Sequence, residues 1–352
     1  MTRRIPAKAL SRLVDDIFRA VGSDAPEAAI IADHLVTSSL VGHDSHGILR
    51  VSKYVEWVRE GDVIPNRHAA IAFEKGPATL VDGGFGYGQV IGLEAMEILA
   101  ERALSSGLAA LGIRNTAHLG RIGHWAEHLA AAGLVSVHFV NTSGFGILVA
   151  PHGGSDRRLS ANPFAAGAPR ASGAPIVLDI ATSVIAEGKI QVARNKGERL
   201  PAGAVLDGQG RPTRDASAFY GDPPGAILPF GGHKGSGLSF FCELIAGALS
   251  GGHASNPASP TAGRLVNNMV SIAFDRDVFG EGAFFAEDEE RLIAWMTGSP
   301  PADPAAPVLL PGEIEIQTRA EREAHGIPVD DATWAGLAAS AASCGLNAVG
   351  YI

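Results

Sequence analysis

A strand, a glycine-rich turn and a helix follow one another between residues 78 and 104, in the order that opens a dinucleotide-binding Rossmann fold. The turn reads Gly83-Gly84-Phe85-Gly86-Tyr87-Gly88. Counted from Gly84 and Gly86, the third glycine of the Rossmann fingerprint falls at position 89, which is Gln89. The next apolar run ends in Arg114, where an acidic residue that binds the ribose is expected. The spacing therefore argues against a Rossmann fold in this chain.

A second glycine-rich loop precedes an apolar helix that we expect from about Leu238 to Leu249. The loop reads Leu228-Pro229-Phe230-Gly231-Gly232-His233-Lys234-Gly235-Ser236-Gly237. Lys234 resembles the lysine of a P-loop, but its surroundings do not follow the Walker order, which argues against a nucleotide hydrolase. Backbone N–H groups and one ammonium group in this loop can still bind a phosphate.

A constellation of acid, base and anion-binding groups lies before both loops, in the stretch from Gly42 to Tyr54. A helix from Gly47 onward places His46 at the helix entrance, with Arg50 and Tyr54 at four-residue steps on the same side. Such a set, with Ser45 beside it, suits a small anionic substrate. Arginine grips a carboxylate with two hydrogen bonds, histidine exchanges a proton near neutral pH, and tyrosine orients an oxygen. The alternative is a surface helix that His46 caps, with Arg50 and Tyr54 merely solvated.

His118 lies in a loop between an apolar strand at Leu108–Ile113 and a helix expected from about Ile122 to Ala132. Loops of this kind often carry functional groups on a rigid scaffold. His124 and His128 follow four residues apart on the helix and could share a metal ion with His118. The zincin order is absent and no nearby cysteine or aspartate completes a ligand set, so we expect no metal site.

Strands are expected at Val135–Val140 and Ile176–Ile180, with an extended turn at Leu159–Phe164 between them. The second strand contains Asp179 and leads, through Thr182 and Ser183, into a helix expected from about Val184 to Arg194. Hydroxyl groups and free backbone N–H groups at that helix start suit a pyrophosphate. The alternative is an ordinary serine or threonine cap.

Helical periodicity marks both ends of the chain. A first amphipathic helix ends at Gly22, a second begins near Pro26, and the helix after His46 ends near Gly61. Near the other end, Leu310-Pro311-Gly312-Glu313 reads as a turn, and a closing helix runs from Asp331 to Ser343.

Composition excludes several classes of function. The chain has 352 residues with 46% hydrophobic and 18% charged residues, enough to bury the cores of two or three globular domains. Its formal net charge of -9 and its lack of a basic block argue against nucleic-acid binding. No segment is long and apolar enough for export or membrane insertion. The two cysteines offer no disulfide framework, so a cytoplasmic location is expected.

Taken together and in this order, the motifs resemble the malate/L-lactate dehydrogenase family of the non-Rossmann type. That family also includes ureidoglycolate, sulfolactate and diketogulonate enzymes and cyclic-imine carboxylate reductases. The resemblance covers nearly the whole chain. The motifs that carry it are Ser45-His46-Gly47 with Arg50 and Tyr54, His118-Leu119-Gly120, Asn162-Pro163, Asp179 with Ala181-Thr182-Ser183, Gly232-His233-Lys234-Gly235 and Leu310-Pro311-Gly312-Glu313.

The resemblance implies an α/β protein whose nicotinamide-binding domain is built on a largely antiparallel sheet. We expect a helical N-terminal region at residues 1–60, a discontinuous α/β substrate and dimerisation domain at 61–119 and 286–352, and a cofactor domain at 120–285. Relatives are usually homodimers. The expected cofactor is NAD or NADP, and no residue decides between them without coordinates.

The same resemblance assigns the site. His46 and His118 border the substrate, Arg50 is its carboxylate clamp, and Asp179 is expected near an imidazole. Ser45 and Tyr54 complete the substrate contacts. The segments that line the cofactor in relatives match Thr182, Ser183, His233, Lys234, Gly235, Pro311, Gly312 and Glu313.

The chain is therefore expected to transfer a hydride between a nicotinamide cofactor and a small 2-hydroxy or 2-oxo carboxylic acid. The alternative within the same class is a cyclic imine-2-carboxylate reductase. A metal-dependent hydrolase and a non-catalytic cofactor-binding protein are alternatives from other classes. Of the two histidines, we expect His46 to be the acid/base because it is placed one turn before Arg50, and His118, on a more independent loop, to orient the substrate.

Overall fold

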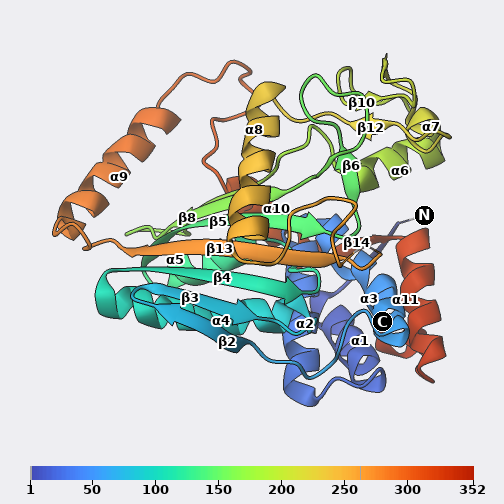
Figure 1. The fold of residues 1–352 in the computed structure, drawn as a ribbon, viewed down its shortest axis with the longest axis horizontal. Coiled ribbons are helices and arrows are strands. Elements are labelled where there is room, and N and C mark those ends of the chain that lie inside the picture. Colours follow the sequence, from blue (N-terminus) through green and yellow to red (C-terminus); the bar gives the residue numbers. More distant parts are fainter. Residues whose placement is uncertain (1, 262) are drawn as a thin grey trace.

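The computed structural model describes residues 2–261 and 263–352 and is organised around a seven-stranded sheet (Figure 1). Within this sheet only β3 and β4 run parallel. The expectation of a largely antiparallel sheet is confirmed. The strand order is β2 (Ala70–Lys75), β3 (Ala78–Asp82), β4 (Leu108–Thr116), β13 (Val266–Asp275), β5 (Leu134–Ser143), β8 (Pro163–Ala168) and β9 (Ile176–Ala181).

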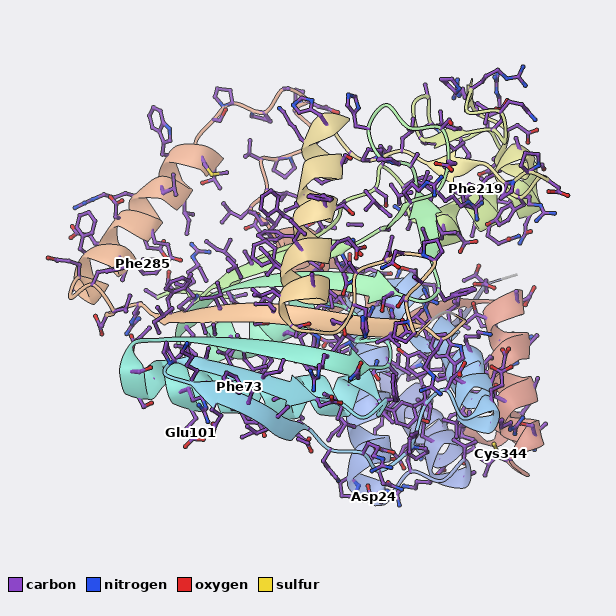
Figure 2. All side chains as sticks on the ribbon, in the orientation of Figure 1. Asp24, Phe73, Glu101, Phe219, Phe285 and Cys344 are labelled. Carbon is purple, nitrogen blue, oxygen red and sulfur yellow. The ribbon has the colours of Figure 1, made fainter. Side chains whose placement is uncertain are left out.

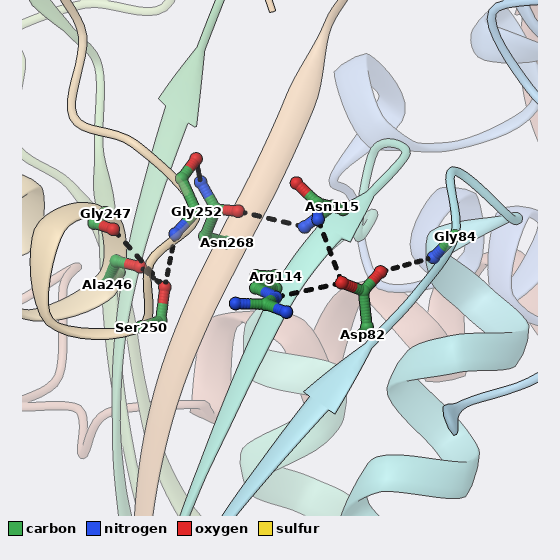
Figure 3. A network of polar contacts seen from close by, with 9 residues as sticks. All are labelled: Asp82, Gly84, Arg114, Asn115, Ala246, Gly247, Ser250, Gly252 and Asn268. Carbon is green, nitrogen blue, oxygen red and sulfur yellow. Dashed lines mark hydrogen bonds and ion pairs between the residues drawn. The ribbon is translucent and has the colours of Figure 1, made fainter. Parts of the chain in front are cut away.

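The unit that imitates a Rossmann opening is a real strand–helix–strand crossover, in which α4 (Gly88–Ser106) joins β3 to the parallel strand β4. The polar groups at the start of this crossover form hydrogen bonds with one another and with neighbouring residues of the sheet (Figure 3). The Asp82 carboxylate at the end of β3 accepts from Arg114 Nε at 2.9 Å, from Asn115 Nδ2 at 3.0 Å and from Gly84 N at 3.0 Å. Arg114, the residue that broke the fingerprint, is thus half of an ion pair that fastens the glycine-rich turn to β4.

Asn268 continues this network across β13 (Figure 3). Its Oδ1 accepts from Asn115 N at 3.1 Å, and its Nδ2 donates to Gly252 O at 2.9 Å. The backbone N–H of Gly252 in turn lies 3.2 Å from the Ser250 hydroxyl. These bonds tie the segment after the apolar helix to the centre of the sheet.

Helices cover both faces of the sheet. Helix α4 and α5 (Gly123–Ala131) pack on one face, where residues from α4, α5 and the strands form one continuous apolar core. Helix α8 (His233–Cys242) and its π-helical continuation η3 (Glu243–Leu249) stand on the other face, against β5 (Figure 1). The predicted helix over 238–249 therefore begins five residues earlier, so that His233 and Lys234 form its first turn.

The N-terminal region is helical, as expected, and shares its core with the C-terminal segment. Asp24 caps the second helix by accepting from Glu27 N at 2.9 Å, and Gly61 ends the third with a φ of 78°. The elements of this region are β1 (Thr2–Ile5), α1 (Ala7–Ala20), α2 (Ala25–Leu40), α3 (Val51–Glu60), β14 (Ile327–Asp330), α11 (Asp331–Ser343) and η4 (Ala348–Tyr351). Strands β1 and β14 pair antiparallel and bring the two chain ends together.

The helix expected from Gly47 begins only at Val51. Residues before it form two short 3₁₀ turns, η1 (Asp44–His46) and η2 (Ile48–Arg50). Gly47 separates them with an extended backbone, φ -95° and ψ -147°, which no helix tolerates. A Cβ at Gly47 would lie 2.0 Å from the Ser39 hydroxyl, so this tight approach to α2 requires glycine.

A smaller, five-stranded sheet forms a separate lobe with its own apolar core (Figure 1). The predicted helix at Val184–Arg194 starts at Glu187, and the predicted extended turn at Leu159–Phe164 contains β7 and the start of β8. The lobe consists of β11 (Pro212–Thr213), β10 (Val205–Leu206), β12 (Ala226–Ile227), β6 (Ile147–Val149) and β7 (Leu159–Ser160), with α6 (Glu187–Lys196) and α7 (Ala216–Phe219).

Two helices lie between β13 and β14 in the described chain. Helix α9 (Gly282–Thr297) extends away from the sheet, and α10 (Glu313–His325) returns toward α2 (Figure 1). Figure 2 shows Phe285 on α9 far from Phe219 in the smaller lobe. The division into residues 1–60, 61–119 with 286–352, and 120–285 stays a prediction. In the structure one continuous sheet joins strands from the second and third of these parts.

Candidate active site

Tyr54, His118 and Gln89 meet in the interior, although they belong to α3, to the loop after β4 and to α4. The Tyr54 hydroxyl lies 2.6 Å from Nδ1 of His118. Gln89 Nε2 donates to the Tyr54 oxygen at 2.9 Å and to the His118 carbonyl at 3.3 Å. The Gln89 atom that faces the Tyr54 oxygen is a donor, so among the described residues Nδ1 of His118 is the acceptor within hydrogen-bond distance of the Tyr54 O–H, and this O–H donates to it. The ring nitrogen that carries the proton in neutral His118 is therefore Nε2.

Gly88 allows α4 to approach His118 this closely. A Cβ at Gly88 would lie 2.3 Å from the His118 carbonyl oxygen and 2.7 Å from Cα of Leu119, where no side chain fits. The last glycine of the Rossmann-like turn thus seats the helix against the loop that carries His118. The loop itself is buried, with Leu119 fully covered, so the expectation that His118 lies on a more independent loop is wrong.

His46 stacks on His118, with ring centroids 5.4 Å apart and an angle of 12° between the ring planes. Nδ1 of His46 lies 3.1 Å from the Ser45 hydroxyl. Nε2 of neither ring makes a hydrogen bond to another described residue. Both imidazoles therefore present one free nitrogen to a ligand.

Arg50 stands beside the two imidazoles and is braced by the turn that precedes it. Its Nε donates to the Ser45 carbonyl at 2.6 Å, and its two terminal nitrogens bond to no other residue in the described chain. Burial and the Arg50 charge lower the pKa of His46 to about 3 and hold the pKa of His118 well below its usual value. Both rings are neutral at pH 7, and the guanidinium is free to bind an anion beside them.

Tyr54 is buried at 2% exposure, and that burial raises the pKa of its phenol above the usual value. The phenol therefore stays protonated and can donate to His118 throughout the physiological pH range. The structure brings together Ser45, His46, Arg50, Tyr54 and His118, as the sequence analysis expects.

Arg121 is a neighbour of this group that the sequence analysis missed. Its backbone N–H donates to His34 Nε2 at 3.0 Å, and its guanidinium, only 1% exposed, pairs with Glu127. The Arg121 charge contributes to the low pKa of His46 and of His34. Its place in the loop between His118 and α5 was the signal that could have found it.

Asp179 does not bind an imidazole in this structure. Its Oδ2 accepts from the backbone N–H of Gly123 at 2.9 Å, and no hydrogen bond or ion pair joins it to a histidine of the described chain. A Cβ at Gly123 would lie 2.8 Å from Asp179 Oδ2 and 2.8 Å from Arg121 Nη1. Asp179 thus holds the first turn of α5 against β9, next to Arg121. The expectation that it lies close enough to an imidazole to tune it stays a prediction.

Thr182 and Ser183 lie beside the second glycine-rich loop. Phe230 N donates to the Thr182 carbonyl at 3.0 Å, and Ser183 forms an isolated bridge with Pro229. They do not cap α6, since that helix starts at Glu187 and the Ser183 hydroxyl donates to the Ile185 carbonyl at 3.1 Å. The Thr182 hydroxyl is buried without a partner, which marks it as a group that a ligand could satisfy.

His233, Lys234 and Gly235 form the first turn of α8, entered through Gly232 at a φ of 62°. A Cβ at Gly235 would lie 2.4 Å from the Phe230 carbonyl and 2.8 Å from the Thr182 carbonyl, so this loop folds tightly onto the Thr182 segment. The Lys234 ammonium is exposed and pairs with no described residue. A helix start, a free ammonium and an orphaned hydroxyl fit the phosphates and amide of a dinucleotide.

His152 is a second residue that sequence reasoning missed. Its ring lies 5.9 Å from that of His233, and its backbone N–H donates to the Ser236 hydroxyl at 3.0 Å. No local pattern pointed to it, because it enters from the smaller lobe.

Pro311, Gly312 and Glu313 form a turn that packs on β9. Val177 N donates to the Pro311 carbonyl at 3.2 Å, and Glu313 accepts from Leu310 N at 2.8 Å. Pro311 and Glu313 line a surface cavity of about 260 Å³. Helix α10 starts at this turn. Glu315 in its first turn contacts His43, with Oε1 of Glu315 3.0 Å from Nε2 of His43.

A model of the malate/L-lactate dehydrogenase family matches residues 5–338 of the chain. The chain belongs to this family. As a member it is an oxidoreductase that acts on the CH–OH group of hydroxy acids, in a family of dehydrogenases that use nicotinamide cofactors. This family membership also explains the failed Rossmann fingerprint.

Three relatives illustrate the family. Hydroxycarboxylate dehydrogenase B of Escherichia coli is 41% identical over 347 residues, which cover 97% of this chain and 95% of that protein. A Δ1-pyrroline-2-carboxylate/Δ1-piperideine-2-carboxylate reductase of Pseudomonas syringae is 35% identical over 94% of each chain. The structure of sulfolactate dehydrogenase from Methanocaldococcus jannaschii superposes with a TM-score of 0.89 at 30% identity, covering 100% of this chain and 99% of that one.

His124, one of the three histidines considered as metal ligands, packs against an aromatic neighbour and another histidine. The His124 ring lies 4.4 Å from that of His34 and contacts Trp125. Within residues 2–261 and 263–352, no group of three or more histidine, cysteine, aspartate or glutamate side chains is arranged to hold a metal ion. In the same part of the chain, no helix is both long and apolar enough to cross a membrane.

Proposed function

We propose that this enzyme transfers a hydride between a nicotinamide cofactor and C2 of a small 2-hydroxy or 2-oxo carboxylic acid. The observation that carries the proposal is the joint placement of Arg50, His46 and a Tyr54-anchored His118 around one site. A carboxylate clamp next to two imidazoles with free nitrogens suits an acid with an oxygen on the neighbouring carbon. Small carboxylates are accordingly the proposed substrates.

Arg50 binds the substrate carboxylate through its two terminal nitrogens, while its Nε stays on the Ser45 carbonyl. The bond from Nε to the Ser45 carbonyl fixes the plane of the guanidinium, and this plane sets the direction from which the carboxylate binds. The bound anion also offsets the Arg50 charge that disfavours protonation of His46 and His118. Substrate binding therefore makes it easier to protonate an imidazole next to the bound substrate.

His118 exchanges the proton with the substrate oxygen through Nε2. Its Nδ1 is held by Tyr54, and its loop is buried between α4 and α5, so the ring is oriented more firmly than that of His46. This assignment reverses the roles expected from the sequence. His46, whose Nδ1 faces the Ser45 hydroxyl, hydrogen-bonds the substrate from the other side of the stacked pair.

The cofactor is proposed to bind along the cluster formed by Thr182, Ser183, His233, Lys234 and Gly235, with the Pro311–Glu313 turn nearby. When bound, a nicotinamide supplies or accepts the hydride at C2 of the substrate. The orphaned Thr182 hydroxyl and the tight fold of Gly235 onto that segment support this location. NAD and NADP both remain open.

A cyclic imine-2-carboxylate reductase is the second proposal. It is supported by the 35% identity to the Pseudomonas syringae reductase. The same Arg50 clamp binds the carboxylate of such an imine, and His118 exchanges the proton with nitrogen instead of oxygen. The two proposals differ in the atom that receives the proton.

We further propose that the enzyme works as a homodimer in the cytoplasm. Exposed apolar side chains gather on α8 and η3, which cover one face of the sheet, and on α9, which extends away from it. They are Phe240, Phe241, Leu244 and Leu249 on α8 and η3, and Phe284, Leu292, Trp295 and Met296 on α9. Both cysteines are free thiols, which fits a reducing compartment. Light scattering at micromolar concentration tests the dimer, and a monomer mass rejects it.

The test of the proposed function is a screen of the purified protein with NADH and NADPH. Fluorescence titration first measures saturable binding of each cofactor. Absorbance of the reduced nicotinamide then follows turnover against a panel of 2-oxo acids and cyclic imines. Turnover with 2-oxo acids supports the first proposal, and turnover confined to imines supports the second. Cofactor binding without any turnover supports a non-catalytic protein, and no binding at all rejects both reductase proposals.

A further inference from the structure

Gln89 is fully buried behind the Tyr54–His118 pair and touches neither the exposed face of the imidazole nor Arg50. We propose that Gln89 is a positioning residue for proton transfer: its side-chain amide, by turning over, lets Tyr54 follow the protonation of His118. The inference rests on the proposed function, in which His118 exchanges a proton with the substrate. It adds a residue that no motif of the chain identified.

The observed arrangement matches neutral His118 with its proton on Nε2. Gln89 Nε2 donates to the Tyr54 oxygen at 2.9 Å, and Tyr54 O–H donates to Nδ1 of His118 at 2.6 Å. The other atom of the amide, Oε1 of Gln89, is buried and has no partner. A buried amide oxygen without a donor is uncommon, and here it lies next to a hydroxyl that must at times find a new acceptor.

Proton transfer at Nε2 requires the opposite arrangement. An imidazolium carries a proton on Nδ1 as well, and that N–H must donate to the Tyr54 oxygen. Solvent supplies the second proton that converts neutral His118 to the imidazolium. When the imidazolium gives its Nε2 proton to the substrate oxygen, the proton on Nδ1 remains, and it returns to solvent when the resting tautomer forms again. In both states the Tyr54 O–H has lost its acceptor, and Gln89 Oε1 provides one as soon as the amide turns over.

The surroundings make the resting arrangement the preferred one. In the observed orientation the Gln89 amide also donates to the His118 carbonyl at 3.3 Å, whereas the turned amide places an oxygen there. The turned orientation is therefore selected only when Nδ1 of His118 holds a proton. The groups that face His118 from other elements are Arg50, His46 and His34, all cationic or neutral, and no described carboxylate bonds to the ring.

Three variants and direct observation of the His118 ring test this relay. Nitrogen NMR of protein labelled in its histidines distinguishes the two neutral tautomers, and the His118 signals are assigned by their loss in His118→Asn. Gln89→Glu keeps an acceptor for Tyr54 and removes the donor. Gln89→Met fills similar space with neither group. Gln209→Glu adds the same charge in an exposed turn of the smaller lobe and is the matched control.

Wild-type His118 and the Gln209→Glu protein should show the proton on Nε2 at neutral pH. Gln89→Glu should protonate Nδ1 and move the pH limit of reduction to higher pH. Gln89→Met should keep the Nε2 tautomer but lower kcat about tenfold or more, part of the roughly hundredfold to ten-thousandfold supplied by positioned acid–base catalysis. The KM of the substrate should stay within about twofold in all variants, since Gln89 does not touch it.

A wild-type His118 with its proton on Nδ1 overturns the proposal, as does a Gln89→Met enzyme with unchanged kcat and pH profile. The same holds if Gln89→Glu leaves both the tautomer and the pH limit unchanged. The tautomer readings by NMR do not depend on the proposed function, whereas kcat and the pH profile do. If wild-type enzyme shows no turnover in the substrate screen, that function fails while the NMR spectra still decide what Gln89 does to His118.

Discussion

The hydroxyl of Tyr54 lies 2.6 Å from Nδ1 of His118, although 64 residues separate them in the chain. The contact joins α3, next to the Arg50 turn, to the loop that follows the central strand β4. It fixes the ring of His118, defines its tautomer and leaves Nε2 without a hydrogen-bond partner among the described residues. The roles of the two stacked histidines follow from this contact, because only His118 has a buried partner of this kind.

Replacing each histidine separates those roles. His118→Asn should lower turnover by roughly a hundredfold to ten-thousandfold, the range of positioned acid–base catalysis, while the cofactor still binds. His46→Asn should mainly raise the KM of the substrate. For reduction, wild-type kcat/KM should fall as pH rises through the His118 pKa, which lies well below the usual value for histidine. For oxidation it should rise over the same interval and be level at neutral pH.

The fall of kcat/KM for reduction with rising pH should persist in His46→Asn and vanish in His118→Asn. The limb of kcat should lie at higher pH than that of kcat/KM, because the bound carboxylate offsets the Arg50 charge. If the limb survives in His118→Asn and is lost in His46→Asn, the roles are the reverse of those proposed.

Arg50→Lys tests the carboxylate clamp. Lysine keeps the charge but loses the planar fork and the bond from Nε to the Ser45 carbonyl. The KM of the substrate should rise about tenfold to a hundredfold, as expected for the loss of a charged hydrogen bond, with little change in cofactor affinity. Arg59→Lys, on the helix α3 that follows Arg50 and bonded to Ser343, is the control. An unchanged KM in Arg50→Lys removes this residue from the site.

Lys234→Ala tests the cofactor loop. The ammonium is exposed at the first turn of α8, so its removal should leave folding intact. The Kd of NADH or NADPH should rise about fivefold to tenfold, since a charged contact at the surface contributes ~1 kcal/mol. Lys196→Ala, at the exposed end of α6, should leave the Kd unchanged. If wild type and Lys234→Ala bind NADH and NADPH with equal affinity, the loop has a structural role and does not bind the cofactor through Lys234.

Acid should destabilise the fold through its buried histidines. His138 lies between the hydroxyls of Ser136 and Ser271, and burial lowers its pKa to about 3. Below pH ~6.5 the His138 side chain binds a proton in the unfolded chain but stays neutral in the folded chain. The free energy of unfolding therefore falls as pH falls. His138 alone should account for ~2 kcal/mol of the loss between about pH 7.5 and about pH 5.

The measurement is the free energy of unfolding in urea at these two pH values. His138→Gln should be less stable than wild type at the higher pH because it disturbs packing, but it should lose less on acidification. An equal loss in both proteins means that His138 does not drive the pH dependence.

Local spacing predicted the parts of this molecule that depend on local geometry. Gln89 in place of the third glycine, together with Arg114 in place of an acidic residue, argued against a Rossmann fold, and Gly61 ended α3 where expected. The periodicity around Val135 found β5. These signals lie within a few residues of the feature they report.

Contacts between distant elements were not predictable in this way. In the sequence, Gln89 stood out only because it occupies the position of the third glycine in the Rossmann fingerprint. Nothing near it in sequence shows that Tyr54 and His118 converge on its side-chain amide. The extended backbone at Gly47, at a close approach to Ser39 of α2 that only glycine allows, displaced the start of α3. Asp179 was expected near an imidazole from the family resemblance, and no local pattern showed that its carboxylate accepts from the backbone N–H of Gly123 in α5.

The central claim is that a hydride passes between nicotinamide and C2 of a carboxylic acid held by Arg50. The direct measurement uses reduced cofactor carrying deuterium at C4, on each face in turn, with the best 2-oxo acid of the panel. Mass spectrometry then locates the label in the product. One cofactor should place a single deuterium on C2 of the 2-hydroxy acid, and the other should place none. Product without deuterium from either cofactor would contradict the account.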